Sequence, residues 1–226
     1  SIDSSYLNNL DKVFESELDK LKNEIFNKSG EEFNLNSPKQ LGDILFDKLK
    51  LVSKPKKTKT GQYSTSEEVL SSLANEHEII RSILEWRSLD KLQNTYVRSL
   101  PNEVSARTGR IHTKFNQTVT TTGRLSSNNP NLQNIPIRTQ NGQKIREAFI
   151  PKNDDFELLA ADYSQIELRV IASISKDKNM IDAFVKNQDI HTITASKIYD
   201  MAPENVTREQ RGNAKTVNFG IIYGVS

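Results

Sequence analysis

The chain has 226 residues with 31 basic and 29 acidic side chains, a net charge of +2, and no cysteine. The lack of cysteine excludes a disulfide framework, a thiolate metal site and a cysteine nucleophile. No apolar run approaches the roughly 18 residues of a membrane span, so we expect no integration into a membrane.

The small net charge hides two basic blocks. Residues 54–60 contain four lysines and no acidic residue, and residues 99–150 contain seven basic residues against two acidic ones. Two such patches are compatible with a track that binds nucleic acid. For the lysine run alone, a solvated surface loop is the alternative interpretation.

The first hundred residues are predicted to be helical. Apolar residues recur at steps of three and four over residues 7–25, which predicts an amphipathic helix that ends at Ser29-Gly30. Ser37 followed by Pro38 is typical of an N-cap and a first helical position, and it predicts a second helix.

A polar segment follows at residues 53–63, which lacks periodicity and is predicted to be a basic loop. Thr65 and Glu68 have the spacing of a capping box, which predicts the start of a third helix. A fourth helix is predicted from about Glu78 to Arg98.

The pattern changes at Pro101. Residues 110–116 alternate apolar and polar side chains like a half-buried strand. Residues 118–142 are rich in Thr, Ser, Asn, Gly and Pro, and a loop of that length is usually functional or disordered. Residues 156–161 form a short apolar run, which predicts a buried strand that ends at Asp162.

Helices are predicted again over residues 165–173 and from Asn179 onward, with a break near Pro203. Thr207 and Gln210 have capping-box spacing, so the last helix is predicted to begin near Thr207.

Asp162 is the first candidate for chemistry. A carboxylate at the end of a strand that turns directly into a helix lies at the edge where α/β sheets place ligands. Carboxylate oxygens suit Mg²⁺, which takes one or two protein carboxylates together with substrate phosphates. The alternative is that Asp162 only caps the following helix.

The last helix carries a stripe of cations and aromatic rings on one face, because the residues step by three or four. Two cations one turn apart suit phosphate oxygens, and aromatic rings suit a nucleobase. The alternative is a solvated basic edge beside a packed aromatic edge. The stripe comprises Arg208, Arg211, Lys215, Phe219 and Tyr223.

Three long segments together resemble the polymerase domain of the family A DNA polymerases, of the bacterial DNA polymerase I type. They are residues 122–138 (TGRLSSNNPNLQNIPIR), 162–169 (DYSQIELR) and 211–224 (RGNAKTVNFGIIYG). The resemblance extends upstream through residues 37–46 (SPKQLGDILF) and 64–70 (STSEEVL). It is collinear over nearly the whole chain.

The resemblance implies an α+β fold cut from a right-hand polymerase. Residues 1–98 would be the helical thumb with a lysine-rich tip at 54–60, residues 99–175 part of the palm with an antiparallel sheet, and residues 176–226 the start of the fingers. The implied activity is template-directed DNA synthesis, with nucleotidyl transfer from a dNTP to a primer 3′-hydroxyl. The implied partners are primer–template DNA, dNTPs and the rest of the polymerase chain, with no membrane. The implied location is the cytoplasm, in association with the nucleoid, if the source is bacterial.

The resemblance also assigns DNA contacts. The lysine tip would lie along duplex phosphates, whose contacts give salt-sensitive and sequence-independent affinity. Arg124 matches the family arginine that reaches the minor groove at the primer end, where acceptors shared by all base pairs report pairing geometry. The implied DNA-binding residues are Lys54, Lys56, Lys57, Lys59, Arg124, Asn131, Gln133, Asn134, Arg138 and Arg146.

Asp162 matches one of two palm carboxylates that hold two Mg²⁺ ions, with the carbonyl oxygen of Tyr163 as a further ligand. Arg211 and Lys215 match the phosphate-binding pair and complete the implied catalytic set with Asp162. Glu167 matches the residue that stands where a 2′-hydroxyl would go. The implied nucleotide-binding residues are Gln165, Glu167, His191, Arg211, Lys215, Phe219 and Tyr223.

The three histidines receive different assignments. His191 matches a histidine near the nucleotide phosphates, with a surface role as the alternative. His77 and His112 match no functional position of the family.

The chain is expected to be a segment. It starts Ser1-Ile2-Asp3 without a visible targeting signal. The family's second palm carboxylate comes after the fingers, beyond Ser226, so the chain alone is expected to be inactive and residues 156–161 to be exposed for want of partner strands. The alternatives are a non-catalytic DNA-binding module derived from such a polymerase, and a helical interaction protein whose motifs are accidental.

Overall fold

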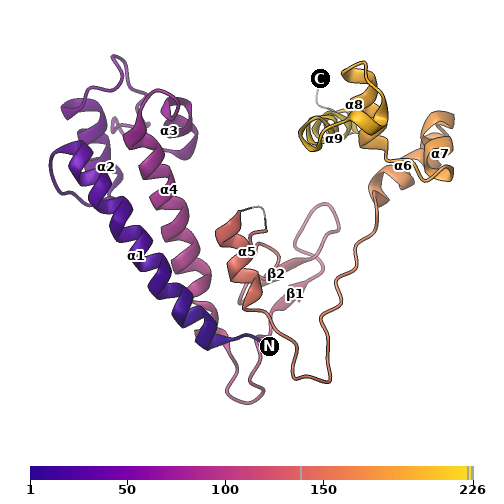
Figure 1. Cartoon of the computed structure of the whole chain (residues 1–226), viewed down its shortest axis with the longest axis horizontal. Coiled ribbons are helices and arrows are strands. Elements are labelled where there is room, and N and C mark those ends of the chain that lie inside the picture. The colour runs from indigo at the N-terminus through magenta and orange to yellow at the C-terminus, as the bar shows by residue number, and fades with distance from the viewer. Residues whose placement is uncertain (138, 223, 225–226) are drawn as a thin grey trace. The chain divides into compact units, whose positions relative to one another are not determined.

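The computed structural model describes residues 1–137, 139–222 and 224, and of Ile222 only the backbone. It divides into two compact units, Ser1–Leu158 and Leu159–Ser226, which are described separately. Helices predominate, and the sheet that the described residues form is a single antiparallel pair of strands, so the predicted α+β class is confirmed (Figure 1).

The first helix, α1 (Ser4–Ser29), ends where the sequence predicted, and both of its ends are capped locally. The Asp3 side chain accepts a hydrogen bond from the Tyr6 amide at 2.8 Å, and Gly30 ends the helix with a φ of 74°. That left-handed conformation favours glycine. The buried residues of the helix are Leu7, Leu10, Phe14, Leu18, Ile25, Phe26 and Ser29.

The second helix is confirmed, with one difference. In α2 (Pro38–Gly42), Ser37 caps the Gln40 amide and Pro38 takes the first helical position. The chain then continues as a π-helical stretch, η1 (Asp43–Lys48).

The third helix begins one residue later than the capping box predicted. In α3 (Glu67–Leu73) the N-cap is Ser66, whose hydroxyl accepts from the Val69 amide, and not Thr65. Thr65 is buried, and its carbonyl oxygen accepts a hydrogen bond from Arg87 at 2.6 Å. Thr65 is therefore held by the fourth helix, which leaves the cap to its neighbour.

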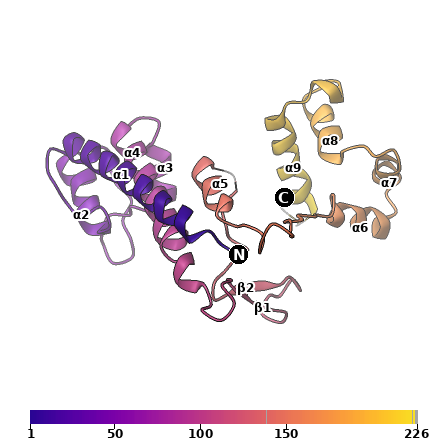
Figure 2. The ribbon, with the colours of Figure 1, turned by 60° about the horizontal axis from the view of Figure 1, so that its bottom comes forward.

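The fourth helix is α4 (Glu78–Leu92), extended by a π-helical stretch, η2 (Gln93–Val97). α1 and α4 lie side by side in both views (Figures 1 and 2). They enclose the main core, in which Phe14, Ile80 and Ile83 are fully buried.

The remainder of the first unit contains a 3-10 turn, η3 (Leu100–Glu103), strands β1 (Lys114–Asn116) and β2 (Ser126–Asn128), and helix α5 (Gln140–Glu147). The strand predicted over residues 110–116 is shorter than expected, and Phe115 is exposed opposite Ser127. Part of the predicted long loop at 118–142 is thus ordered. The Asp3 amide donates to the Ala148 carbonyl at 2.8 Å, which ties the N-terminus to the end of α5.

The buried strand predicted at residues 156–161 is absent from this part of the structure. The segment has no strand hydrogen bonds, and Leu159 is 93% exposed. A strand is stable only when a neighbouring strand satisfies its backbone groups, and the described residues supply no such neighbour. The expectation that this run would be exposed is confirmed.

The second unit is helical, as predicted. It contains α6 (Ile166–Ser175), α7 (Lys178–Val185), α8 (Ile190–Ile198), a 3-10 turn η4 (Pro203–Asn205) and α9 (Arg208–Ile222). The capping box at the start of α9 is confirmed, because the Thr207 and Gln210 side chains each accept from the other residue's amide. α8 and α9 pack closely through Ala195 and Ala214, both fully buried. No helix in the described ranges is long and apolar enough to cross a membrane.

Candidate nucleic-acid and nucleotide sites

The lysine tip, residues 54–60, is a short hairpin between η1 and α3. The Thr58 amide donates to the Gln62 carbonyl at 2.7 Å, and the Ser64 amide donates to the Lys56 carbonyl at 2.8 Å. All four lysines are exposed. The tip therefore presents a positive surface, as a phosphate track requires.

The second basic region surrounds the segment between β2 and α5. Arg124 precedes β2, while Asn131, Gln133 and Asn134 follow it, and all four are exposed. Asn131 also orders the segment, because its side-chain oxygen accepts from the Gln133 amide at 3.0 Å.

Arg146 and Arg138 are the other residues predicted to bind DNA in this region. Arg146 donates to the carbonyls of Pro136 and Ile135 at 3.1 and 3.3 Å, so its guanidinium braces the backbone that carries the amide side chains. Arg138 lies outside the described residues.

A groove of about 450 Å³ runs beside this region and contains two cations that the sequence analysis missed. Arg87 and Lys91, one turn apart on α4, line it together with Asn134 and Tyr96. Burial lowers the pKa of Arg87, whose guanidinium also holds Thr65. The spacing of the two cations on one helix face was the signal that could have identified them.

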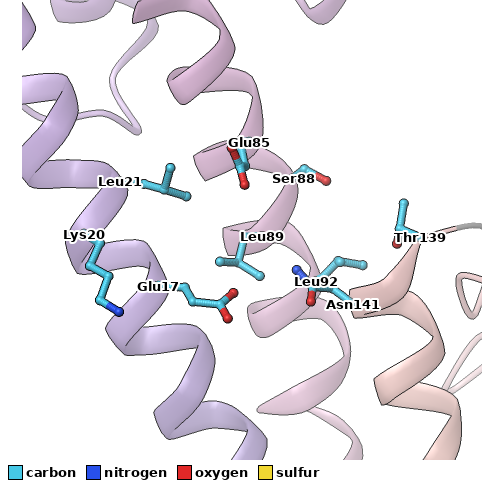
Figure 3. Close-up of a pocket in the computed structure, with 9 residues that line it drawn as sticks. All are labelled: Glu17, Lys20, Leu21, Glu85, Ser88, Leu89, Leu92, Thr139 and Asn141. Atoms are coloured by element: carbon cyan, nitrogen blue, oxygen red, sulfur yellow. The ribbon is translucent and has the colours of Figure 1, made fainter.

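A second groove, of about 370 Å³, lies between α1, α4 and α5 (Figure 3). Its lining includes Glu17 from α1 and Glu85 from α4, and none of the residues predicted for a site. Two carboxylates against the single ammonium of Lys20 disfavour phosphate, so we do not include this groove in the nucleic-acid surface.

Asp162 and Tyr163 precede α6 and are both exposed. The alternative role of Asp162 as a helix cap is wrong, because the N-cap of α6 is Gln165. Gln165 has a φ of 54°, a left-handed conformation uncommon for a residue other than glycine. Its side-chain oxygen is buried and has no hydrogen-bond partner among the described residues. Glu167, in the first turn of α6, is half-buried.

The start of α8 and the first three turns of α9 bring together several predicted residues. Arg211 donates from Nε and Nη2 to one oxygen of Asp189, at 3.2 and 2.6 Å. Asp189 also caps α8 by accepting from the Thr192 amide at 2.9 Å. Arg211 is thus an oriented cation within the described chain, although its side chain is still 41% exposed. Asp189 was not predicted; its N-cap position before α8 was the available signal.

His191 is 2% exposed, so a surface role for it is wrong. Its Nδ1 lies 3.1 Å from the side-chain nitrogen of Asn218, and its ring centroid lies 5.7 Å from that of Phe219. The Lys215 ammonium is exposed and lies 5.9 Å from the Phe219 ring centroid. Tyr223, the remaining predicted residue of this stripe, lies outside the described residues.

The charged groups around Asp189 and His191 shift the pKa values of both residues. Burial alone would raise the pKa of Asp189, but hydrogen bonds from Arg211 and the Thr192 amide outweigh it, so the pKa lies below its ordinary value. Burial lowers the pKa of His191; Asp189 opposes that shift, and Arg211 and Lys215 reinforce it. The Asp189 carboxylate offsets the charge of Arg211, and the exposed Lys215 is the other cation of the cluster.

The donors for a metal fit Mg²⁺ in kind but not in number. The Asp162 carboxylate and the Tyr163 carbonyl are hard oxygen donors of the type that Mg²⁺ takes. In residues 1–137, 139–222 and 224, no group of three or more His, Cys, Asp or Glu side chains could hold a metal ion. A Mg²⁺ ion held by Asp162 and the Tyr163 carbonyl would therefore need further ligands from outside the described residues.

Comparisons with known proteins cover nearly the whole chain. A family model described as DNA polymerase family A matches residues 4–226. The chain is 53% identical to DNA polymerase I of Geobacillus stearothermophilus and 51% identical to that of Bacillus subtilis (strain 168), over all of this chain and 26% and 25% of those proteins. It thus spans about a quarter of these relatives' length. A solved structure, the POL domain of Pol1 from M. smegmatis in complex with DNA primer-template and dNTP, matches with a TM-score of 0.86 and 41% identity, over all of this chain and 40% of that one.

Proposed function

Because the chain belongs to DNA polymerase family A, we propose that it is a segment of an enzyme that extends a DNA primer on a template. The reaction transfers a nucleotidyl group from a dNTP to the primer 3′-hydroxyl and releases pyrophosphate. In this proposal residues 1–98 form the thumb, 99–175 part of the palm, and 176–226 the start of the fingers.

The observation that carries the proposal is the cation pair of α9. Arg211 and Lys215 lie one turn apart, Arg211 is oriented by two hydrogen bonds to Asp189, and the ring of the buried His191 lies 5.7 Å from that of Phe219. Oriented cations suit a triphosphate, and they stabilise charge that develops on the departing phosphates. Phe219 would contact the base of the nucleotide, and Tyr223 would do so as the sequence predicts.

The residues that open α6 would receive the sugar and the metal. Glu167 is proposed to exclude a 2′-hydroxyl, with Gln165 beside it. Asp162 and the Tyr163 carbonyl would hold Mg²⁺, which in such sites lowers the pKa of the attacking hydroxyl and neutralises charge on the phosphate oxygens. The second carboxylate that the family requires would come from another part of the polymerase.

The first unit would hold the duplex. The lysine tip would contact phosphates, which gives affinity without sequence preference. Arg124 and the amides of Asn131, Gln133 and Asn134 would face the minor groove, with Arg138 as predicted from the sequence and Arg146 as the brace beneath them. Arg87 and Lys91 extend the positive surface along the adjacent groove.

Primer extension by the full-length polymerase proposed here tests the function. Lys215→Ala should reduce kcat/KM for dNTP by roughly 10²–10³-fold, the range for removing one donor that stabilises transition-state charge. Lys197→Ala, which removes an exposed lysine from α8, is the matched control and should have little effect. Equal rates for the two variants, or no templated extension by the unmodified enzyme, would contradict the proposal.

The 226-residue chain by itself should behave as the binding-module alternative describes. It should bind primer–template DNA at low salt and extend no primer with Mg²⁺ and all four dNTPs, because one carboxylate does not position two ions. Template-directed extension by the pure chain would show that the missing carboxylate is not required.

A further inference from the structure

Tyr63 is held at the base of the lysine tip by three residues, Gly42, Phe46 and Asp47, which we call the tyrosine seat. Its hydroxyl donates to Asp47 Oδ1 at 2.5 Å, and its ring centroid lies 5.3 Å from that of the buried Phe46. A Cβ atom at Gly42 would come within 2.9 Å of the Tyr63 Cβ, so only glycine allows this close approach. The seat belongs to α2 and η1, and its Phe46 is part of the main core.

The hairpin of the tip is built on Tyr63. Lys57 and Tyr63 form an antiparallel bridge, and the Gly61 amide donates to the Thr58 carbonyl at 3.0 Å in the turn between them. Gly61 has a φ of 82°, which this turn requires. Because Lys57 on the outgoing arm pairs with Tyr63 on the returning arm, fixing Tyr63 also fixes the outgoing arm, which carries most of the lysines.

The four lysines of the tip are not equivalent. The Lys57 ammonium lies over the Tyr63 ring, 5.1 Å from its centroid. Lys56 is 3.9 Å from Glu68, but both side chains are mostly exposed, and such pairs contribute little. Lys54 and Lys59 have no ion-pair or cation–π partner in the part of the chain that the structure describes.

We propose that Tyr63 and Lys57 position the tip, and that Lys54, Lys56 and Lys59 are the lysines that contact DNA phosphates. This division of roles rests on the proposed DNA-binding function and refines it. A tip that is already ordered loses less conformational freedom on binding, so the positioning pair raises affinity without touching phosphate. The lysines that contact phosphate release counterions, so only they affect the salt dependence.

Hydrogen exchange of the 226-residue chain without DNA tests the seat. Tyr63→Ala should accelerate amide exchange over residues 57–63 by about tenfold, since it removes both ring contacts and the hydrogen bond. Tyr63→Phe removes only the hydroxyl and should accelerate exchange by about threefold or less. Amides of α1 and α4 serve as the internal control and should not change. Unchanged exchange over residues 57–63 in Tyr63→Ala would overturn the role of the seat.

Duplex binding at several salt concentrations tests the division of roles. Lys54→Ala, Lys56→Ala and Lys59→Ala should each make the slope of log affinity against log salt shallower by about 0.9. Lys57→Ala should leave the slope unchanged and weaken binding by roughly threefold at every salt concentration, and Lys57→Arg should restore affinity because Arg also forms cation–π contacts. Lys12→Ala, on the exposed face of α1, is the control for charge alone.

Different outcomes would contradict the division of roles among the lysines and the proposed DNA-binding function of the tip. Equal slopes for Lys57→Ala and Lys59→Ala would overturn the division of roles. If Lys54→Ala, Lys56→Ala and Lys59→Ala all bind like Lys12→Ala, the tip does not contact DNA, and the proposed phosphate track is wrong even where exchange supports the seat.

Discussion

The ion pair between Asp189 and Arg211 gives the second unit a test in which charge and helix capping can be separated. Asp189 accepts from Arg211 and, at the N-cap of α8, from the Thr192 amide. Asp189→Asn keeps a good capping side chain but removes the negative charge, because Asn and Asp are equally favoured at N-caps. Asp189→Ala removes both interactions.

The expected magnitudes follow from the exposure of the pair. The side chains of Arg211 and Asp189 are 41% and 34% exposed, so solvent screens their attraction to about 0.5–1 kcal/mol. Loss of an N-cap costs about 1 kcal/mol. Asp189→Asn should therefore destabilise α8 by about 0.5–1 kcal/mol, and Asp189→Ala by about 1.5–2 kcal/mol. At about 1.4 kcal/mol per factor of ten, these are roughly threefold and tenfold to thirtyfold effects on local opening.

Hydrogen exchange of the α8 amides measures this opening without interference from the first unit. Equal acceleration in Asp189→Asn and Asp189→Ala would refute the separation of charge from cap. Exchange in α3 should not change in either variant, because α3 belongs to the other unit.

The same variant has a functional consequence in the proposed polymerase. Because the Asp189 carboxylate is proposed to orient Arg211 for the triphosphate, Asp189→Asn should raise the Kd for dNTP by about two- to fivefold, the equivalent of up to about 1 kcal/mol. Rapid-quench measurement of ground-state dNTP affinity provides the value. Tighter binding in Asp189→Asn would mean that the Asp189 carboxylate competes with the triphosphate for Arg211 and does not orient it.

Two further predictions concern single residues. Glu167→Ala in the proposed polymerase should raise ribonucleotide incorporation relative to deoxyribonucleotide, because bulk and charge beside C2′ are lost. The ratio of the two kcat/KM values measures this change, and Glu209→Ala is the control. An unchanged ratio would show that Glu167 does not exclude the 2′-hydroxyl. His191 has a pKa below its ordinary 6.5, so the fold favours its neutral form, and the stability that it contributes is full above pH 6.5 and is lost as pH falls through the folded pKa. Exchange of α8 and α9 amides, corrected for intrinsic rates, should therefore accelerate between pH 7 and pH 5 in the native chain and much less in His191→Gln. The same acceleration in both chains would show that a group other than His191 causes the pH dependence. Asp189 is not that group, because its pKa lies below its ordinary value.

The elements that local sequence predicted well are those whose ends are set by residues a few positions apart. The Gly30 stop of α1 and the Thr207–Gln210 box of α9 both appear as expected. The Gly30 amide donates to the Phe26 carbonyl and the box pairs side chains with amides, so all the interacting groups lie within about one helical turn of each other. The same reasoning identified Arg211 and Lys215 as neighbours on α9, because helical periodicity alone places them one turn apart.

Tertiary structure decided the features in which a distant residue competes with a local one. Arg87 holds the carbonyl of Thr65 and leaves the cap of α3 to Ser66. The apolar run at 156–161 has the composition of a strand, but a strand takes its hydrogen bonds from another segment, and composition does not reveal whether one is present.

The two positioning interactions also lay beyond the sequence. Asp189 meets Arg211 across 22 residues, and Tyr63 meets Asp47 across 16. Sequence thus determined which cations the chain carries and on which helix face they lie. Only the packing of α8 against α9, and of the tip against η1, decided which cations contact neighbouring side chains, because those contacts join segments that no local pattern relates.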